Sequence, residues 1–339
     1  MKAVGLTRYL PIDNVQALID VTLPKPQAIG RDLLVRIEAV SVNPVDTKVR
    51  APKDKIEDTP RVLGWDAAGV VESIGDAVSL FKPGDAVYYA GDITRSGSNA
   101  QFQLVDERIV ARKPRTLSFA QAAAFPLTTI TAWELLFQRM GYSIEGGGRG
   151  KSLLILAGAG GVGSIAIQLA KLAGFSVIAT ASRPETADWC KAQGADHVVD
   201  HRQALRPQLE KYGLTQVDSI LNLVDTDAYW EVMADLIAPQ GKIGLIVEPK
   251  GALKIGDPLK AKSVGIHWEM MFTRAAFKTA DIAEQGRLLA RAAELIDTGK
   301  LRSTLTETLT PISAANLREA HQRAESGRTI GKLALADWD

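Results

Sequence analysis

The stretch that decides the fold is Ser152-Leu153-Leu154-Ile155-Leu156-Ala157-Gly158-Ala159-Gly160-Gly161-Val162-Gly163-Ser164. It begins with a short apolar run typical of a buried strand, and a run with helical periodicity, Ile165 to Leu172, follows it. The glycines between them have the spacing G-x-G-x-x-G. A strand, a glycine turn and a helix in this order indicate the first unit of a doubly wound parallel sheet.

The spacing of the glycines indicates a dinucleotide-binding turn. Gly158 allows a tight turn, Gly160 lets the backbone approach a pyrophosphate, and Gly163 lets the helix pack closely on the strand. Free N–H groups and the partial positive charge at a helix start attract phosphate. We therefore predict cofactor contacts at Gly158, Gly160, Gly161, Val162 and Gly163. The alternative is a structural glycine turn with no ligand.

Alternating strands and helices surround this turn and predict a Rossmann domain. Parallel sheets built from βαβ units have this rhythm. The predicted strands are Ser152–Leu156, Phe175–Ala181, His197–Val199, Val217–Leu223, Lys242–Val247 and Ser263–Trp268.

The N-terminal part has a different pattern. Short β-branched runs such as Leu33–Ile37, Gly69–Ile74 and Ala86–Tyr89 are separated by Gly, Pro and Asp, which predicts a β-rich domain. After a helix at Asp281–Thr298 the chain loses the βαβ rhythm, so we expect its tail to return to this domain. The predicted division is 1–127 completed by 275–339, and 128–274 for the Rossmann domain.

The end of the second sheet strand predicts NADPH rather than NADH. NAD-binding proteins place an acidic residue there for the ribose 2′-OH. This chain instead has Thr180, Ala181, Ser182 and Arg183, which offer hydroxyls and a positive charge to a 2′-phosphate. An alternative is that Ser182 caps the helix beginning at Pro184 and that Arg183 is a solvated charge.

The composition fits a small-molecule partner. Lys and Arg number 40 against 39 Asp and Glu, which leaves no general positive field for nucleic acid or anionic membranes. Long uncharged apolar runs are missing, and the single cysteine, Cys190, suits a reducing compartment. We expect a cytoplasmic protein.

The residues do not form a recognisable metal or nucleophile site. One Cys and four His are too few for both a catalytic and a structural zinc site, and their spacing shows no ligand motif. A G-x-S-x-G motif is missing as well. The chemistry is therefore expected to come from a cofactor.

Several motifs together resemble the medium-chain dehydrogenase/reductase superfamily and its quinone oxidoreductase branch, close to zinc-type alcohol dehydrogenase-like proteins. They are Ser41–Asp46, Leu63–Val71, Lys82–Val87, Ala157–Gly163 and Gly331–Leu333. The resemblance implies a GroES-like catalytic domain, a Rossmann domain and an active site between them. Zinc-dependent members have a Cys near Pro44 and Gly-His-Glu where this chain has Gly64-Trp65-Asp66, and they carry a cysteine-rich lobe near Gly91–Ala100. These ligands are missing here, so we expect a zinc-free enzyme.

The resemblance also implies individual site residues. Arg183 and His201 would lie on the 2′-phosphate side of NADPH. Thr128 and Asn43 would lie near the nicotinamide, and Asn222, Val224 and Val247 would line the cofactor site. Asn43, Asp46 and Trp65 are the catalytic candidates. Alternatively, Asn43-Pro44 is a turn and Asp46 a helix cap.

The predicted function is therefore hydride transfer from NADPH to a quinone, an enone or a similar small carbonyl acceptor. Two alternatives stay open: an enoyl-thioester reductase, tested by a basic patch around Lys48, Arg50 and Arg95, and a non-catalytic NADPH-binding sensor or structural protein. We also expect a homodimer, in which Lys262–Phe272 pairs with its copy.

Overall fold

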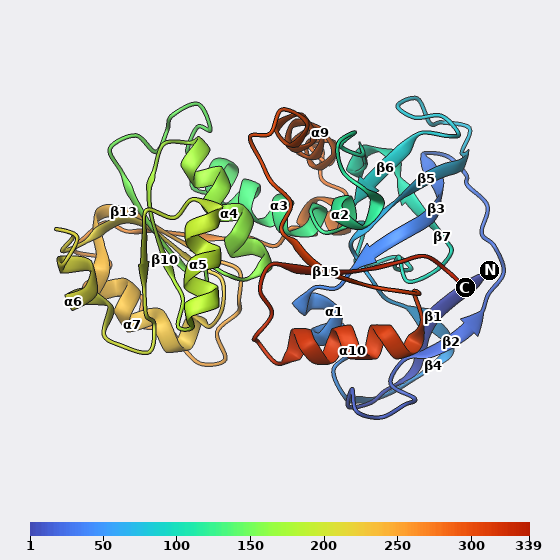
Figure 1. Cartoon of the computed structure of the whole chain (residues 1–339), viewed down its shortest axis with the longest axis horizontal. Coiled ribbons are helices and arrows are strands. Elements are labelled where there is room, and N and C mark those ends of the chain that lie inside the picture. Colours follow the sequence, from blue (N-terminus) through green and yellow to red (C-terminus); the bar gives the residue numbers. More distant parts are fainter. The chain divides into compact units, whose positions relative to one another are not determined.

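The strand before the glycine turn, β9 (Ser152–Leu156), lies inside a six-stranded parallel sheet of order β11-β10-β9-β12-β13-β14 (Figure 1). All five residues of β9 are buried, as expected for a strand covered on both faces. This strand order is that of a doubly wound nucleotide-binding sheet. The computed structural model, which describes residues 1–339, thus confirms the predicted fold class.

Helices alternate with the strands of this sheet. The remaining strands are β10 (Ser176–Thr180), β11 (His197–Val199), β12 (Val217–Asn222), β13 (Ile237–Leu245) and β14 (Gly265–Trp268). The helices are α4 (Gly161–Leu172), α5 (Pro184–Gln193), α6 (Leu205–Glu210) and α7 (Thr226–Leu236), preceded by a π-helical segment, η2 (Glu134–Arg139). Strand β13 begins earlier than the predicted Lys242, because Ile237 already pairs with Val217 directly after α7.

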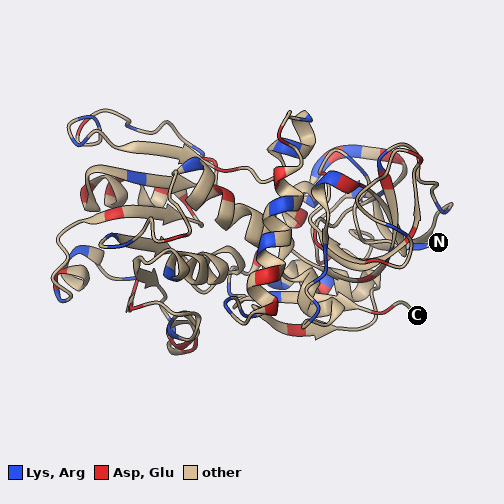
Figure 2. Ribbon diagram, turned by 90° about the horizontal axis from the view of Figure 1, so that it is seen from above, with Lys and Arg blue, Asp and Glu red and all other residues tan.

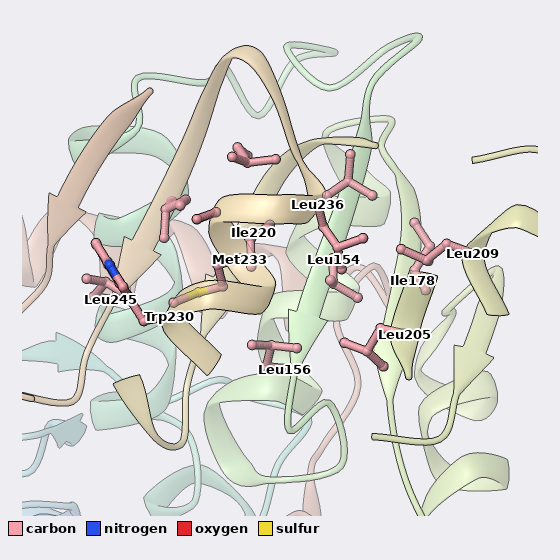
Figure 3. Close-up of a cluster of buried hydrophobic side chains, with 14 of the residues drawn as sticks. Leu154, Leu156, Ile178, Leu205, Leu209, Ile220, Trp230, Met233, Leu236 and Leu245 are labelled. Carbon is pink, nitrogen blue, oxygen red and sulfur yellow. The ribbon is translucent and has the colours of Figure 1, made fainter. Parts of the chain in front are cut away.

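A hydrophobic cluster fills one side of this sheet (Figure 3). Side chains of β9, β12 and β13 meet those of α6 and α7 there, including Leu154, Ile220, Leu209 and Trp230. The indole N–H of Trp230 remains hydrogen-bonded, since it donates to the carbonyl of Lys254 at 2.9 Å. The cluster holds the strands at fixed spacing, so the ends that carry the glycine turn are rigidly supported.

The chain divides into two compact units, Met1–Ile130 with Phe272–Asp339, and Thr131–Met271. The predicted boundaries, after residues 127 and 274, lie three residues from these. In each unit Lys and Arg are interspersed with Asp and Glu (Figure 2). No helix has the length and apolar character needed to span a membrane.

The first unit is β-rich. A seven-stranded sheet of order β15-β16-β3-β5-β6-β8, with β7 also on β3, accompanies a three-stranded sheet of order β2-β1-β4. The strands are β1 (Lys2–Tyr9), β2 (Ile19–Thr22), β3 (Asp32–Ser41), β4 (Lys53–Val62), β5 (Ala67–Ile74), β6 (Ala86–Tyr89), β7 (Phe102–Asp106), β8 (Ala111–Arg112), β15 (Leu305–Leu309) and β16 (Lys332–Ala336). The helices are α1 (Pro44–Arg50), η1 (Glu107–Ile109), α2 (Phe119–Ala123), α3 (Pro126–Trp133, of which 126–130 belong to this unit), α8 (Thr273–Phe277), α9 (Glu284–Asp297) and α10 (Ala314–Glu325).

The C-terminal tail belongs to this unit. Strand β16 pairs antiparallel with β3, with Leu335 opposite Val40, and parallel with β15. Helix α10 packs against α1 (Figure 1). A residue from the far end of the chain therefore lies beside the segment that carries the catalytic candidates Asn43 and Asp46.

Candidate functional site

The glycine turn joins β9 to α4 and is held from behind by β10. Ala157 takes the left-handed conformation (φ 64°), so the tight bend lies one residue before the predicted Gly158. The N–H groups of Ala157 and Gly158 donate to the hydroxyl and carbonyl oxygens of Thr180 at 3.0 and 3.1 Å. Thr180 is 1% exposed. Thr180 therefore supports the turn, and the cofactor contact predicted for it stays a prediction.

The glycines differ in what surrounds them. A Cβ on Gly163 would lie 2.5 Å from the carbonyl oxygen of Ala157, and one on Gly158 would lie 2.7 Å from the Cβ of Ala179. A Cβ on Gly160 would meet only the Ala157 carbonyl oxygen, at 3.5 Å. Gly158 and Gly163 thus allow internal packing, while Gly160 faces open space in which a ligand can approach the backbone.

The start of α4 presents unpaired donors beside that open space. The N–H groups of Gly161, Val162 and Gly163 have no acceptor within the chain, because a helix start lacks the preceding turn. Together with the helix dipole they favour a negative group. The residues that could hold a pyrophosphate here are Gly160 to Gly163, and the cofactor contact of each stays a prediction.

Ser182 and Arg183 follow β10 at the same end of the sheet. The cap of α5 is made by Arg183 and Thr186: the Arg183 N–H donates to Thr186 Oγ1 at 3.1 Å, and that hydroxyl donates to the Arg183 carbonyl at 2.8 Å. The alternative in which Ser182 caps this helix is therefore wrong. Its hydroxyl makes no hydrogen bond within the chain, and the Arg183 guanidinium lies 3.2 Å from the Glu185 carboxylate.

His201 lies in the turn that follows β11, and β11 is the strand next to β10 in the sheet. Partial burial lowers the pKa of its imidazole, which favours the neutral ring. A neutral ring is suited to stacking rather than to pairing with a phosphate. The neighbouring Arg202 is held by the Asp200 carboxylate at 2.9 Å.

The residues predicted after β12 and β13 differ in exposure. Asn222 is fully buried, and its side chain closes the turn by donating to the Asp225 carbonyl at 2.9 Å and accepting the Val224 N–H at 3.2 Å. Val224 is 45% exposed. The carbonyl of Val247 accepts a hydrogen bond from the Thr226 hydroxyl. Asn222 thus shapes the loop, and Val224 is the residue that presents a surface.

The remaining predicted residues lie in the first unit. Thr128 is buried in α3, and its hydroxyl donates to the Phe125 carbonyl at 3.1 Å. Trp65 is 1% exposed, its indole N–H donates to the Asp92 carbonyl at 3.2 Å, and its ring packs edge-on against Phe272. Both are well ordered by packing, and neither has a free polar atom.

Asn43 and Asp46 belong to a buried polar cluster at the start of α1. Asp46 accepts the Asn43 backbone N–H at 2.6 Å through Oδ2, so the expected capping role is present. Its other oxygen, Oδ1, is buried without a partner. Burial is the largest cause of a rise in the pKa of Asp46 to about 7, which the charge of Lys332 opposes. This carboxyl can gain and lose a proton near neutral pH.

Two members of the cluster were not among our predicted site residues, Asp66 and Lys332. The Lys332 ammonium donates to Asn43 Oδ1 at 2.5 Å and to Asp66 Oδ2 at 3.2 Å, and the Asn43 amide donates to the same Asp66 oxygen at 2.7 Å. The only local signal was a lysine at the start of an apolar strand. Its partner is 266 residues away, so the pairing appears only when β16 meets β3 and β5.

The cluster does not fit zinc. Zinc takes thiolate, imidazole or carboxylate ligands. In this cluster Asn43 offers an amide, Lys332 is a cation, and the Asp66 carboxylate is already bonded to that ammonium, which leaves Asp46 as the one further carboxylate. Across the chain, no group of three or more His, Cys, Asp or Glu side chains is arranged to hold a metal ion.

Comparison with family models matches both units. Residues 30–115 match the alcohol dehydrogenase GroES-like domain and residues 193–335 match the zinc-binding dehydrogenase family. A zinc-type alcohol dehydrogenase-like protein of Staphylococcus epidermidis is 42% identical, with 99% of each chain covered. A 2-methylene-furan-3-one reductase of Solanum lycopersicum is 32% identical over 99% of this chain and 79% of its own.

Solved structures agree with these matches. A protein of Rhizobium etli classed as a zinc-dependent alcohol dehydrogenase is 49% identical, with a TM-score of 0.94 and coverage of 100% of this chain and 98% of its own. The mycobacterial protein Rv1454c, solved with NADPH, is 28% identical, with a TM-score of 0.83 and coverage of 99% and 100%. The chain belongs to the medium-chain dehydrogenase/reductase superfamily of oxidoreductases, among the zinc-type alcohol dehydrogenase-like proteins.

Proposed function

We propose that this oxidoreductase is a zinc-independent, NADPH-dependent reductase of quinones, enones or similar small electron-poor acceptors. The observation that carries the proposal is the cradle at the start of α4, where unpaired N–H groups border the open side of Gly160. A nicotinamide dinucleotide held there supplies a hydride. The NADPH complex of the 28% identical mycobacterial protein supports this cofactor.

The choice of NADPH rests on the residues after β10 and β11. The strand end carries no carboxylate that would accept from the ribose 2′-OH, whereas the free hydroxyl of Ser182 and the Arg183 guanidinium can bind a 2′-phosphate. His201 would stack on the adenine side. The acceptor class is supported by the name of the tomato relative, which describes reduction of an enone by that protein.

The test is NADPH consumption with a panel of quinones, enones and aldehydes, with NADH as the matched cofactor. We expect turnover with at least one activated alkene or quinone and a preference for NADPH. NADPH binding without turnover on any acceptor would contradict the enzymatic proposal and favour the non-catalytic sensor.

Zinc independence needs a separate test, because zinc bound during expression would itself contribute to the measured activity. The protein is dialysed against a strong chelator, its metal content is measured, and activity is compared before and after. We expect unchanged activity. Activity that disappears with the chelator and returns with zinc would contradict the proposal.

A second candidate, enoyl-thioester reduction, is favoured by a groove in the first unit. This groove, about 430 Å³, is lined by Lys55, Arg61 and Arg95 and by one carboxylate, Glu57. The Arg61 guanidinium donates to the Tyr9 hydroxyl at 2.9 Å and has no ion pair. It is therefore the cation most available to a coenzyme phosphate.

The basic patch first expected around Lys48, Arg50 and Arg95 is largely neutralised. Arg50 is buried and pairs with Glu325, and Arg95 is held by both oxygens of Asp32. An R61Q variant separates the two candidates. It should raise KM for an enoyl-coenzyme A substrate and leave KM for a simple enone unchanged if thioesters are the substrates.

We also propose a homodimer formed along β14. This strand pairs only with β13, so its outer edge has free backbone groups. Trp268, the last residue of β14, and Met270, which follows it, are 48% and 52% exposed. An apolar edge of this kind pairs readily with a second copy across a two-fold axis.

A further inference from the structure

The cluster around Lys332 joins three distant parts of the chain. Lys332 begins β16, Asp66 precedes β5, and Asn43 precedes α1. Lys332 is 3% exposed, Asn43 1% and Asp66 0%. Burying two charges and an amide together is costly unless each polar atom is matched.

We infer that Lys332 is a positioning residue of the proposed reductase: its ammonium fixes the Asn43 amide and keeps Asp66 as a carboxylate, which leaves Asp46 as the group that carries an exchangeable proton. The catalytic role of Asp46 in this inference rests on the proposed function. The arrangement of charge and protons can be measured in the resting protein, without turnover.

The hydrogen bonds of Lys332 match an ammonium completely. Its three N–H donors have three acceptors: the Val42 carbonyl at 2.9 Å, Asn43 Oδ1 at 2.5 Å and Asp66 Oδ2 at 3.2 Å. A neutral amine would have only two donors for these three oxygens. The surroundings therefore select the charged form, although burial lowers the pKa of this lysine.

The surroundings of Asp66 match a carboxylate in the same way. Its Oδ1 accepts the Leu127 N–H at 2.8 Å, and its Oδ2 accepts from Asn43 and Lys332. Every partner is a donor, so a protonated Asp66 would point its own hydrogen at another hydrogen. Burial raises the pKa of Asp66, and Lys332 opposes that rise.

Asn43 is oriented by this ion pair. Its oxygen faces the ammonium and its NH2 faces the carboxylate, and the reversed amide would place like groups together. The backbone N–H of the same residue is bonded to Asp46. Lys332 therefore sets the orientation of the side chain and, through residue 43, the position of the Asp46 carboxyl.

Asp46 is the remaining acid of the cluster. One ammonium balances one carboxylate, so a second buried carboxylate beside them would be uncompensated. The unpartnered Oδ1 of Asp46 is the oxygen on which a proton can reside without meeting a donor. Reduction adds a hydride and a proton to the acceptor. The chain's part is to break the O–H bond of Asp46, form an O–H or C–H bond on the product, and take a new proton from water.

The other charged groups near α1 are occupied elsewhere. On α10, which packs on α1, Glu325 pairs with Arg50, and His321 is fully buried near the same arginine. The charges that act on Asp46 are Lys332, which favours ionisation, and Asp66, which opposes it. The attraction of Lys332 is the larger of the two.

The test follows the titration of Asp46 by carboxyl ¹³C NMR in protein labelled at aspartate, with D46N to assign the signal. K332M should move the titration of Asp46 to higher pH, because the stronger of the two charges is removed. D66N should move it to lower pH, because the repelling charge is removed. K332R should stay close to the native curve.

The control is K48M, which removes an exposed cation from the same helix as Asp46. It should leave the titration unchanged. D66N keeps the shape of the network, so it remains informative if K332M folds poorly. Titrations that do not move, or that move in the same direction in K332M and D66N, would overturn the inference.

Turnover adds a second measurement. If the proposed reductase activity is found, D46N should lower kcat by roughly 100-fold, the scale of general acid catalysis. K332M should lower kcat with little change in the KM of the acceptor and should shift the pH profile upward. A protein with the predicted titrations but no turnover would refute the proposed function alone.

Discussion

A single methyl group at Gly160 should separate cofactor binding from folding. Gly160 has φ −72° and ψ 174°, a conformation open to alanine, and an added Cβ meets only one atom, the Ala157 carbonyl oxygen at 3.5 Å. The G160A variant should therefore fold with native stability, or gain slightly because the unfolded chain loses freedom. The methyl fills the space through which a pyrophosphate approaches the backbone. One excess methyl in a fitted site costs roughly 10- to 200-fold in affinity, or about 1–3 kcal/mol.

Two measurements test this prediction. Urea unfolding without cofactor gives the free energy of unfolding, and fluorescence titration with NADPH gives Kd. The matched variant is G163A, whose Cβ would lie 2.5 Å from one backbone oxygen and 2.6 Å from another. It should lose about 1–3 kcal/mol of stability as well as affinity, because packed backbone must move. Unchanged NADPH affinity in G160A would refute the assignment of the open side of Gly160 to the pyrophosphate.

Three further predictions concern other parts of the molecule. R183Q should reduce the preference for NADPH over NADH about tenfold or more, since it removes a charge-assisted bond to the 2′-phosphate; the two Kd values measure it, and an unchanged ratio speaks against this residue. E269Q should flatten the dependence of the free energy of unfolding on pH. Burial, and next the charge of Glu134, raise the pKa of Glu269 to about 8. The stability that the protonated carboxyl contributes is therefore present at acidic pH and lost as the pH rises through about 8. Urea unfolding across that range checks this, with the native protein expected to lose stability and the variant to lose less. W268E should convert the proposed dimer to a monomer by placing charge on the edge of β14; light scattering that still reports the same mass would contradict that interface.

The Rossmann unit was largely predictable because its signals are local. A buried parallel strand, a glycine turn and a helix follow one another between Ser152 and Leu172, and each is specified by neighbouring residues. The strand order of this sheet follows from the rules for βαβ units. Even here Ala157, rather than a glycine, adopts the left-handed conformation. The carbonyl and hydroxyl of Thr180 hold that turn, a tertiary contact that the pattern does not contain.

The first unit was less predictable because its contacts are distant. Strand β4 (Lys53–Val62) is rich in charged residues and lacks apolar alternation, yet it pairs with β1 through an irregular register. Asp66 and Lys332 are separated by most of the chain, and their charge pairing depends on β16 joining β3. Residue type pointed to Asn43 and Asp46, but their hydrogen-bond partners required the folded sheet.

The return of β16 to β3 has a consequence for the order in which the chain can fold during synthesis. The unit from Thr131 to Met271 is continuous and can assemble as soon as it leaves the ribosome, since domains generally fold as units. The other unit must wait, because residues 332–336 supply the strand beside β3 and the only ammonium in its buried cluster. Until then residues 39–41 of β3 lack their partner strand and Asp66 lacks its ammonium. An incomplete sheet of this kind is prone to wrong pairing, so this step is where a chaperone would be most useful.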